Sequence, residues 1–175
     1  MDEMIDILDE QTGNKTGELI LKSKAHKEGK WHGSVHILIV NKEHTKTLLQ
    51  KRQSNKDLFP DMWDIAVGGH ISAGESALIS AERELYEELG LKPEQLKLKE
   101  LDRVKEQFTD GGIISCEFVT IFIAYKEVDL SEIKLQKEEV SEVKWCTKSE
   151  LNKYISDRSI IPHIREYEIL NDILK

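Results

Sequence analysis

The segment from Gly68 to Leu91, GGHISAGESALISAERELYEELGL, constrains the fold more than any other part of the chain. Ser76 is a typical N-cap residue, and Gly90 is typical of a left-handed C-terminal cap. Between them, apolar side chains recur at helical spacing at Ala77, Ala81, Leu85 and Leu89. The segment therefore predicts a glycine-containing turn followed by an amphipathic helix that buries one face.

The polar face of this predicted helix carries Glu84, Glu87 and Glu88. Their spacings of three and four residues place the three side chains on one face, where like charges cost roughly a few tenths of a kcal/mol per pair. A hard divalent cation removes this cost, because Mg²⁺ prefers carboxylate oxygens, water and substrate phosphate. Arg83 lies four residues before Glu87, within reach of its carboxylate. The sequence therefore predicts a cation site here, and a solvated helix face is the alternative.

Composition limits the possible partners of the chain. Its 175 residues suffice for one domain with a sizeable core, and 39% hydrophobic with 33% charged residues is typical of a globular protein. A formal net charge of -8 argues against polymeric nucleic acid, which is held by Lys and Arg. A small phosphorylated substrate stays possible, because a bound cation inverts the local charge.

The N-terminal residues, the apolar runs and the cysteines predict the cellular location of the protein. The first ten residues, MDEMIDILDE, are acidic without an apolar core, so they do not resemble a signal peptide. The apolar runs are too short to span a membrane. Cys116 and Cys146 are the two cysteines, and we expect both to be reduced core residues. These features predict a cytoplasmic protein that does not bind membranes.

The remaining sequence predicts a single domain, 1–175, of mixed α/β or α+β class, with helices packed on a mixed sheet. Residues 1–33 are expected to form an N-terminal hairpin or extension, and residues 160–175 a C-terminal helix after Pro162. Between them, strands are predicted at 35–40, 47–52, 63–67, 98–108, 112–126 and 142–145. A short helix is expected to begin near Lys148.

The central segment resembles the signature box of the Nudix hydrolases. From Gly69 the chain has five residues, Glu75, seven residues and then RELYEELGL, so every defining position of the box is present. The stretches LLQKR, PDMWDIAVGGH and EVKWCTKSEL extend the resemblance over about 34–154. It implies the Nudix α/β/α sandwich, a mixed sheet flanked by helices. It also implies hydrolysis of a diphosphate linkage in a small organic substrate, expected to be a nucleoside diphosphate derivative.

The resemblance also implies roles for individual residues of the box. Glu84, Glu87 and Glu88 are expected to bind Mg²⁺ or Mn²⁺, with Glu75 assisting. The Gly69 carbonyl is a further candidate ligand, and Arg83 is expected to position a carboxylate. By family analogy we expect a homodimer rather than a monomer.

The general base is not fixed by the sequence. Glu87 is the first candidate, and Glu117, Glu138 and Glu139 are the alternatives. Arg52, on the LLQKR strand, is a candidate phosphate-binding residue, or else an exposed edge residue.

Two aromatic residues near the box, Phe59 and Trp63, have two interpretations each. Phe59 and Trp63 would stack on a base if they face the substrate, but an aromatic residue in an entry loop more commonly belongs to the core. We expect Trp145 to be a core residue.

The histidines extend the resemblance to isopentenyl-diphosphate isomerases and their hydrolase-like relatives. HKEGKWH and WDIAVGGH match that branch, which implies a second metal site of His26, His32, His70 and Glu117, although His26 falls one residue short of the usual spacing. Alternatively, these histidines and His36 hydrogen-bond to backbone groups. Gly68 stands where the isomerases carry a proton-transferring cysteine, which favours hydrolysis. A non-catalytic nucleotide-sensing module is a third possibility, but such modules usually lose box carboxylates.

Overall fold

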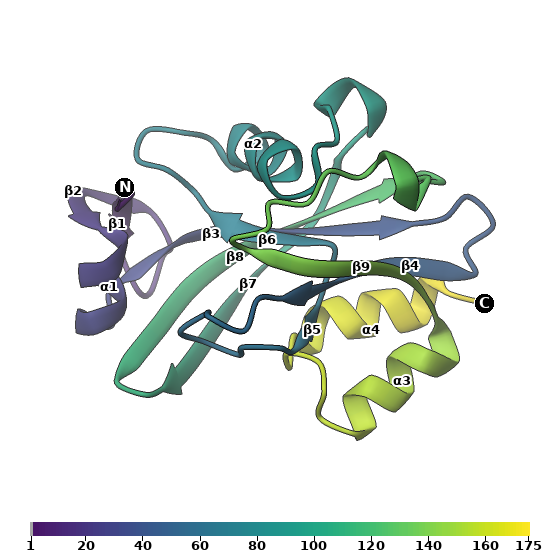
Figure 1. Ribbon diagram of the computed structural model, residues 1–175. Helices are drawn as coiled ribbons and strands as arrows, with labels where there is room; N and C mark the ends of the chain where they lie inside the picture. Colours follow the sequence, from purple (N-terminus) through teal and green to yellow (C-terminus); the bar gives the residue numbers. More distant parts are fainter. Residues whose placement is uncertain (1) are drawn as a thin grey trace.

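The computed structural model describes residues 2–175 (Figure 1). The N-terminal part is an antiparallel hairpin, β1 (Met4–Leu8) and β2 (Lys15–Leu21), followed by the short helix α1 (Lys22–Glu28). The hairpin agrees with the sequence-based expectation. Helix α1 was not predicted, because it buries only Ala25 and so carries no apolar periodicity; Gly29, at φ 63°, ends it.

The other strands form one seven-stranded mixed sheet in the order β5-β4-β3-β8-β7, with β6 paired to β3 and β9 paired to β4. Their bounds are β3 Trp31–Val40, β4 Lys46–Arg52, β5 Trp63–Asp64, β6 Val67–His70, β7 Lys99–Asp110, β8 Ile113–Tyr125 and β9 Val140–Thr147. The central strands β3 and β8 are parallel, and their register runs from Trp31 opposite Cys116 to Val40 opposite Tyr125. Strand β6 runs antiparallel to β3, with His70 opposite Ser34.

Helices cover both faces of the sheet (Figure 1). Helix α2 (Ala77–Leu89) lies on one face, while α3 (Lys148–Ser156) and α4 (Ile164–Ile173) lie on the other. Two short 3-10 turns, Pro93–Gln95 and Leu130–Glu132, lie in connections. This is the α+β sandwich with a mixed sheet that the sequence predicts.

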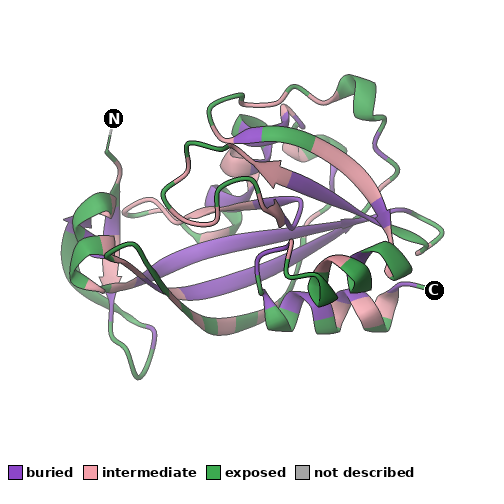
Figure 2. Cartoon of the chain, turned by 60° about the horizontal axis from the view of Figure 1, so that its bottom comes forward, coloured by how far each residue is buried: buried purple, intermediate pink, exposed green. Residues whose placement is uncertain are grey.

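The alternation of β3 explains why two cores form. Ile37 and Ile39 point toward α2 and join Leu85 in the first core, whereas Leu38 points the other way and joins Leu170 in the second. All of these side chains are almost fully buried, and Figure 2 shows the buried central strands between partly exposed helices. The sheet therefore separates the two cores, and α2 packs on one side of it.

Two predicted elements have different bounds. The strand expected at 63–67 is divided into β5, which pairs with β4, and β6, which pairs with β3. Apolar patterning does not specify the neighbour of a strand, so the change of partner at Ile65–Ala66 was not visible. The C-terminal helix covers Ile164–Ile173 rather than 160–175, because Pro162 and His163 precede its first turn.

Two further expectations concern the cysteines and membranes. Cys116 and Cys146 are free and buried, as expected. Within residues 2–175, no helix combines the length and apolar character needed to cross a bilayer.

Candidate metal sites

Helix α2 begins and ends at the residues that the sequence predicts. The Ser76 hydroxyl accepts a hydrogen bond from the Ile79 backbone N–H at 3.3 Å, and Gly90, at φ 67°, forms the left-handed cap. Packing of Leu85 and Leu89 into the first core turns the opposite face, with its glutamates, toward a cavity. The local sequence therefore fixes both the helix and the direction of its acidic face.

Arg83 makes most of the hydrogen bonds on this face. Its guanidinium donates to the carboxylates of Glu84 (2.7 Å), Glu87 (3.3 Å) and Glu75 (3.3 Å), and to the His70 backbone carbonyl (3.1 Å). The contact with Glu87 is the one expected from the four-residue spacing. Arg83 thus positions the carboxylates and ties α2 to the end of β6.

Glu88 is the buried member of the acidic face, and the Glu84 side chain is 13% exposed. Burial raises the pKa of Glu84 to about 7, even though Arg83 lowers it. Burial, reinforced by the charge of Glu84, raises the pKa of Glu88 well above its ordinary range. The Gln50 side-chain N–H donates to Glu88 at 3.0 Å, while the Gln50 amide oxygen is buried without a hydrogen-bond partner.

These oxygens fit a hard divalent cation. Carboxylates whose charge is disfavoured by burial gain most from a nearby positive ion, and carboxylate and amide oxygens are preferred Mg²⁺ ligands. Arg83 lies between Glu84 and Glu87 and donates to both. Among residues 2–175, no group of three or more His, Cys, Asp or Glu residues whose ligand atoms lie within 4.8 Å of one another includes a glutamate of this helix. The donor set is present, and binding requires the carboxylates to close around the ion.

Gly69 has a close steric relationship with Glu84. A Cβ atom on Gly69 would lie 2.2 Å from the Glu84 carboxyl carbon, so no larger residue fits there without displacing Glu84. At the neighbouring Gly68 the nearest atom to such a Cβ would be 3.5 Å away, which is ordinary contact. The glycine requirement at Gly69 thus arises from close approach of β6 to the carboxylate.

The acidic face opens into a cavity of about 570 Å³. Arg52 and Lys56 line it together with the glutamates, so positive side chains face the carboxylates across the space. The Arg52 guanidinium also donates to the Leu58 carbonyl at 3.2 and 3.1 Å. Of the alternative bases, Glu139 lines this cavity and pairs with Lys56, whereas Glu138 is exposed to solvent.

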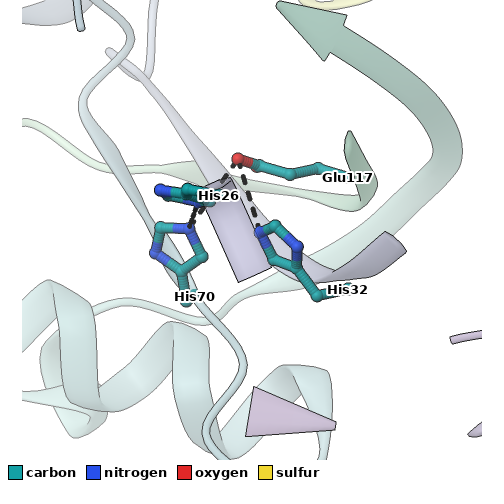
Figure 3. A group of neighbouring side chains, drawn as sticks. All are labelled: His26, His32, His70 and Glu117. Atoms are coloured by element: carbon teal, nitrogen blue, oxygen red, sulfur yellow. Dashed lines mark hydrogen bonds and ion pairs between the residues drawn. The ribbon is translucent and has the colours of Figure 1, made fainter. Parts of the chain in front are cut away.

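The four residues of the expected second site lie together, although they come from four different elements (Figure 3). His26 lies on α1, His32 on β3, His70 on β6 and Glu117 on β8. Their ligand atoms lie within 4.8 Å of one another. Glu117 Oε1 is 3.8 Å from His32 Nε2 and 3.7 Å from His70 Nε2, and His26 Nε2 is 3.2 Å from His70 Nε2.

The free ring nitrogen and the burial of this histidine cluster suit a metal. His32 Nδ1 donates to the Lys30 carbonyl at 2.8 Å, which assigns the lone pair to Nε2, and Nε2 is buried without a partner. Burial lowers the pKa of His26 and lowers that of His70 well below its ordinary value. Burial alone would raise the pKa of Glu117, but His70 and His32 hold it well below its ordinary range. Three imidazoles and one carboxylate form a donor set of the zinc type.

The two sites adjoin one another. The histidine cluster borders a smaller chamber of about 130 Å³, and this chamber shares Arg52, Gly68, Gly69 and His70 with the larger cavity. His70 joins them directly, since its carbonyl accepts from Arg83 while its ring belongs to the cluster. Glu117 therefore lies in the side chamber rather than on the acidic helix.

The aromatic residues divide between chamber and core. Phe59 lines the chamber, where its ring meets that of Phe108 edge-on at 5.2 Å. Trp63 stacks with Tyr154 at 5.8 Å and packs against the second core. Trp145 packs against the first core, as expected.

Sequence reasoning missed several polar residues. Gln50 lies on β4 and gave no signal. A cluster of histidines and carboxylates was also missed. His36, Asp64, Glu106 and His163 line the chamber. Glu166 contacts His36 through its carboxylate, so the expected backbone partner of His36 was wrong. These residues are separated by up to 130 positions, and only the register of the sheet and the docking of α4 bring them together.

Comparison with known proteins identifies the family. Residues 30–164 match the NUDIX domain. The chain is 37% identical over 182 residues to Nudix hydrolase 3 of Arabidopsis thaliana; the match covers 99% of this chain but only 23% of that protein. It is 33% identical to an isopentenyl-diphosphate Delta-isomerase of Dinoroseobacter shibae, covering 78% of this chain and 76% of that protein. DR0079 from Deinococcus radiodurans has the same fold, with a TM-score of 0.74 and 19% identity over 99% of this chain and 100% of that one.

The chain belongs to the Nudix hydrolase family, as the box between Gly69 and Leu91 predicts. The match begins just before β3 and ends at the start of α4, so the N-terminal hairpin and α1 precede it. His26, which completes the histidine cluster, therefore comes from outside the matched segment.

Proposed function

We propose that this protein hydrolyses the diphosphate linkage of a small organic substrate, a nucleoside diphosphate derivative, with Mg²⁺ or Mn²⁺ bound on α2. The observation that carries this proposal is that Glu84 and Glu88, whose pKa values are raised by burial, line one cavity with Arg52, where a cation would stabilise their ionised forms. The cavity volume of about 570 Å³ lies in the usual range for small-molecule sites.

A divalent cation in this position supplies neutralisation of phosphate charge and a bound water of lowered pKa. Glu84, Glu87 and Glu88 would hold it, with Glu75 and the Gly69 carbonyl in support. Arg83 keeps Glu84 and Glu87 in place through its hydrogen bonds to both.

Proton transfer is assigned to Glu87. Its side chain is 47% exposed and lines the cavity, so it can meet a water molecule that the less exposed Glu84 and Glu88 cannot reach as freely. Arg52 is assigned to the substrate phosphate. Glu117 is better suited to the second metal site, because it is enclosed by His32 and His70.

The histidine cluster is proposed to bind a second divalent cation of the transition-metal type. Its support is the convergence of three imidazoles and one carboxylate around the unpartnered His32 Nε2. Replacing His32 and His70 together by Gln should remove one tightly bound metal ion per chain. An unchanged number of bound metal ions in the folded variant would contradict this proposal. His44→Asn is the matched control, because His44 belongs to neither histidine cluster.

A panel of diphosphates assayed with Mg²⁺ and with Mn²⁺ tests the activity. We expect release of phosphate or nucleoside monophosphate from at least one nucleoside diphosphate derivative. If folded, cation-loaded protein leaves every member of the panel intact, the hydrolase proposal fails. A nucleotide-sensing module would then bind one of the compounds without turnover.

The isomerase is the second candidate, favoured by the histidine cluster and by the isomerase relatives. Gly68 counts against it, because no thiol stands at that position. Incubating isopentenyl diphosphate with the protein in D₂O separates the two activities. Isomerisation exchanges hydrogen on carbon, so deuterium in the recovered compound would support the isomerase, whereas its absence agrees with hydrolysis.

A further inference from the structure

We propose that a second histidine–carboxylate cluster, made of His36, Glu106, His163 and Glu166, binds a divalent transition cation of the zinc class. The four residues come from β3, β7, the segment before α4, and α4 itself. Each offers one ligand atom, and these atoms lie within 4.8 Å of one another. The cluster is separate from the acidic helix and shares no residue with the first histidine cluster.

The contacts within this cluster form two histidine–carboxylate pairs that lie next to each other. His36 Nδ1 lies 2.6 Å from Glu166 Oε1, and His163 Nδ1 lies 2.9 Å from Glu106 Oε2. The two imidazole rings meet edge-on with centroids 4.4 Å apart. Two nitrogen and two oxygen donors are thus held around one point.

Glu166 supplies an independent sign of a ligand. The residue is fully buried, and its Oε2 atom has no hydrogen-bond partner. A buried carboxylate oxygen without a donor is costly, and native structures normally pair such atoms with protein, water or an ion. A cation bound by the Glu166 carboxylate would supply the positive partner that this buried group lacks at Oε2.

Asp64 adds an outer contact typical of metal sites. Its Oδ1 lies 3.0 Å from His163 Nε2, while His163 Nδ1 faces the cluster. Metal-binding histidines commonly donate their other ring N–H to a carboxylate, which fixes the tautomer. The Ile65 backbone N–H donates to the same Asp64 oxygen at 2.8 Å and holds it in place.

Charge balance also permits the ion. Asp64, Glu106 and Glu166 contribute three negative charges, and Arg52 Nη1, 3.7 Å from Asp64 Oδ2, contributes one positive charge. Burial lowers the pKa of His163, but Asp64 and Glu106 raise it well above its ordinary value, so a divalent cation must displace a proton to bring this buried set to neutrality. Two protons on the histidine pair supply the same charge, so the cation competes with protons rather than adding unbalanced charge.

The donor set specifies the class of ion and an entry path. Two imidazoles and two carboxylates suit tetrahedral Zn²⁺, whose bonds of about 2.1 Å place ligand atoms about 3.4 Å apart. The ligand atoms lie within 4.8 Å of one another, so the side chains must move closer together to reach this spacing. His36, Glu106 and His163 line the chamber beside the active-site cavity, which gives the ion a route from solvent. Once bound, it would link α4 to β3 and β7.

The decisive experiment uses the full-length variant His26→Gln/His70→Gln, in which the first histidine cluster is removed. The cation-depleted variant is titrated with Co²⁺, a spectroscopic substitute for Zn²⁺, in excess Mg²⁺ that occupies the acidic helix. We expect one Co²⁺ per chain, with visible absorption typical of nitrogen ligation and a higher melting temperature. A folded variant that binds no Co²⁺ under these conditions overturns the proposal.

Two substitutions in this background locate the ion. Glu166→Gln keeps the shape of the side chain and is expected to weaken Co²⁺ binding at least tenfold. Asp64→Asn should weaken it by about 10- to 100-fold through loss of the outer contact. His44→Asn should leave the affinity unchanged. Equal Co²⁺ affinity in folded Glu166→Gln and in its parent would overturn the proposal. If Glu166→Gln does not fold, the Co²⁺ titration of the parent variant His26→Gln/His70→Gln is the test.

Discussion

The acidic face of α2 and the histidine cluster at its side are built in opposite ways. The acidic face is a continuous run of helix that offers only oxygen donors, and Arg83 bridges the carboxylates of Glu84 and Glu87. The histidine cluster draws one residue from each of four elements and already has its ligand atoms close together. An oxygen-only face that closes around its ion suits exchangeable Mg²⁺ carried with substrate, whereas a preformed nitrogen-rich site suits a resident transition ion.

The largest expected effect comes from Glu88→Gln, which removes a charge from the acidic face but keeps its hydrogen-bonding shape. Because a catalytic cation supplies several kcal/mol of transition-state stabilisation, we expect turnover to fall by about 10³-fold or more. Steady-state phosphate release with saturating Mg²⁺ measures this. Glu82→Gln, on the same helix but lining neither cavity, is the control. Comparable turnover in the two variants would break the assignment.

The acidic face should also make the cation-free protein sensitive to pH. Burial raises the pKa of Glu84 from 4.5 to about 7, so the folded state binds this proton more tightly than the unfolded chain. Its contribution to stability is complete below about pH 4.5 and is lost as the pH rises through about 7. We expect a loss on the order of 3 kcal/mol in the free energy of unfolding by pH 8.

Urea denaturation at low and high pH, in a chelator and in Mg²⁺, measures this loss. Mg²⁺ should restore stability mainly at high pH, and Glu84→Gln should flatten the profile recorded in the chelator. A profile that is the same in Glu84→Gln and in the unsubstituted protein would show that Glu84 is not the group responsible. The histidine cluster should give no such Mg²⁺ effect.

A smaller effect is expected from Gly69→Ala. The added methyl carbon would lie 2.2 Å from the Glu84 carboxyl carbon, so the carboxylate must move. Displacement of about 1 Å in a catalytic group costs about 10²-fold in rate. Gly68→Ala, whose methyl meets only ordinary contact at 3.5 Å, should cost much less. Equal losses of kcat in the two variants would mean that close approach to Glu84 is not the reason for the glycine.

The acidic face of α2 was predictable because its information is local. The spacing of Glu84, Glu87 and Glu88, the N-cap at Ser76 and the C-cap at Gly90 all lie within a few helical turns, where geometry follows from sequence. The α+β architecture was predictable for the same reason, since β3 and α2 carry strong apolar periodicity. The Arg83–Glu87 contact followed from their four-residue spacing.

The second histidine–carboxylate cluster was not predictable by such means. His36 and Glu166 meet only because α4 docks on the face of the sheet where β3 presents that histidine, and His163 meets Glu106 through the position of β7. Sequence patterns indicate which face of an element is buried but not which distant element covers it. Gln50 illustrates the same limit, because its contact with Glu88 depends on the position of β4 relative to α2.

The most direct test of the central claim is an electron paramagnetic resonance titration with Mn²⁺. Protein depleted of cations is titrated in the presence of a non-hydrolysable diphosphate analogue, with Glu84→Gln/Glu88→Gln as the comparison. If α2 holds the cation against the diphosphate, the unsubstituted protein binds at least one Mn²⁺ that the double variant lacks. The same number of Mn²⁺ ions with the same affinity in both proteins would contradict the account.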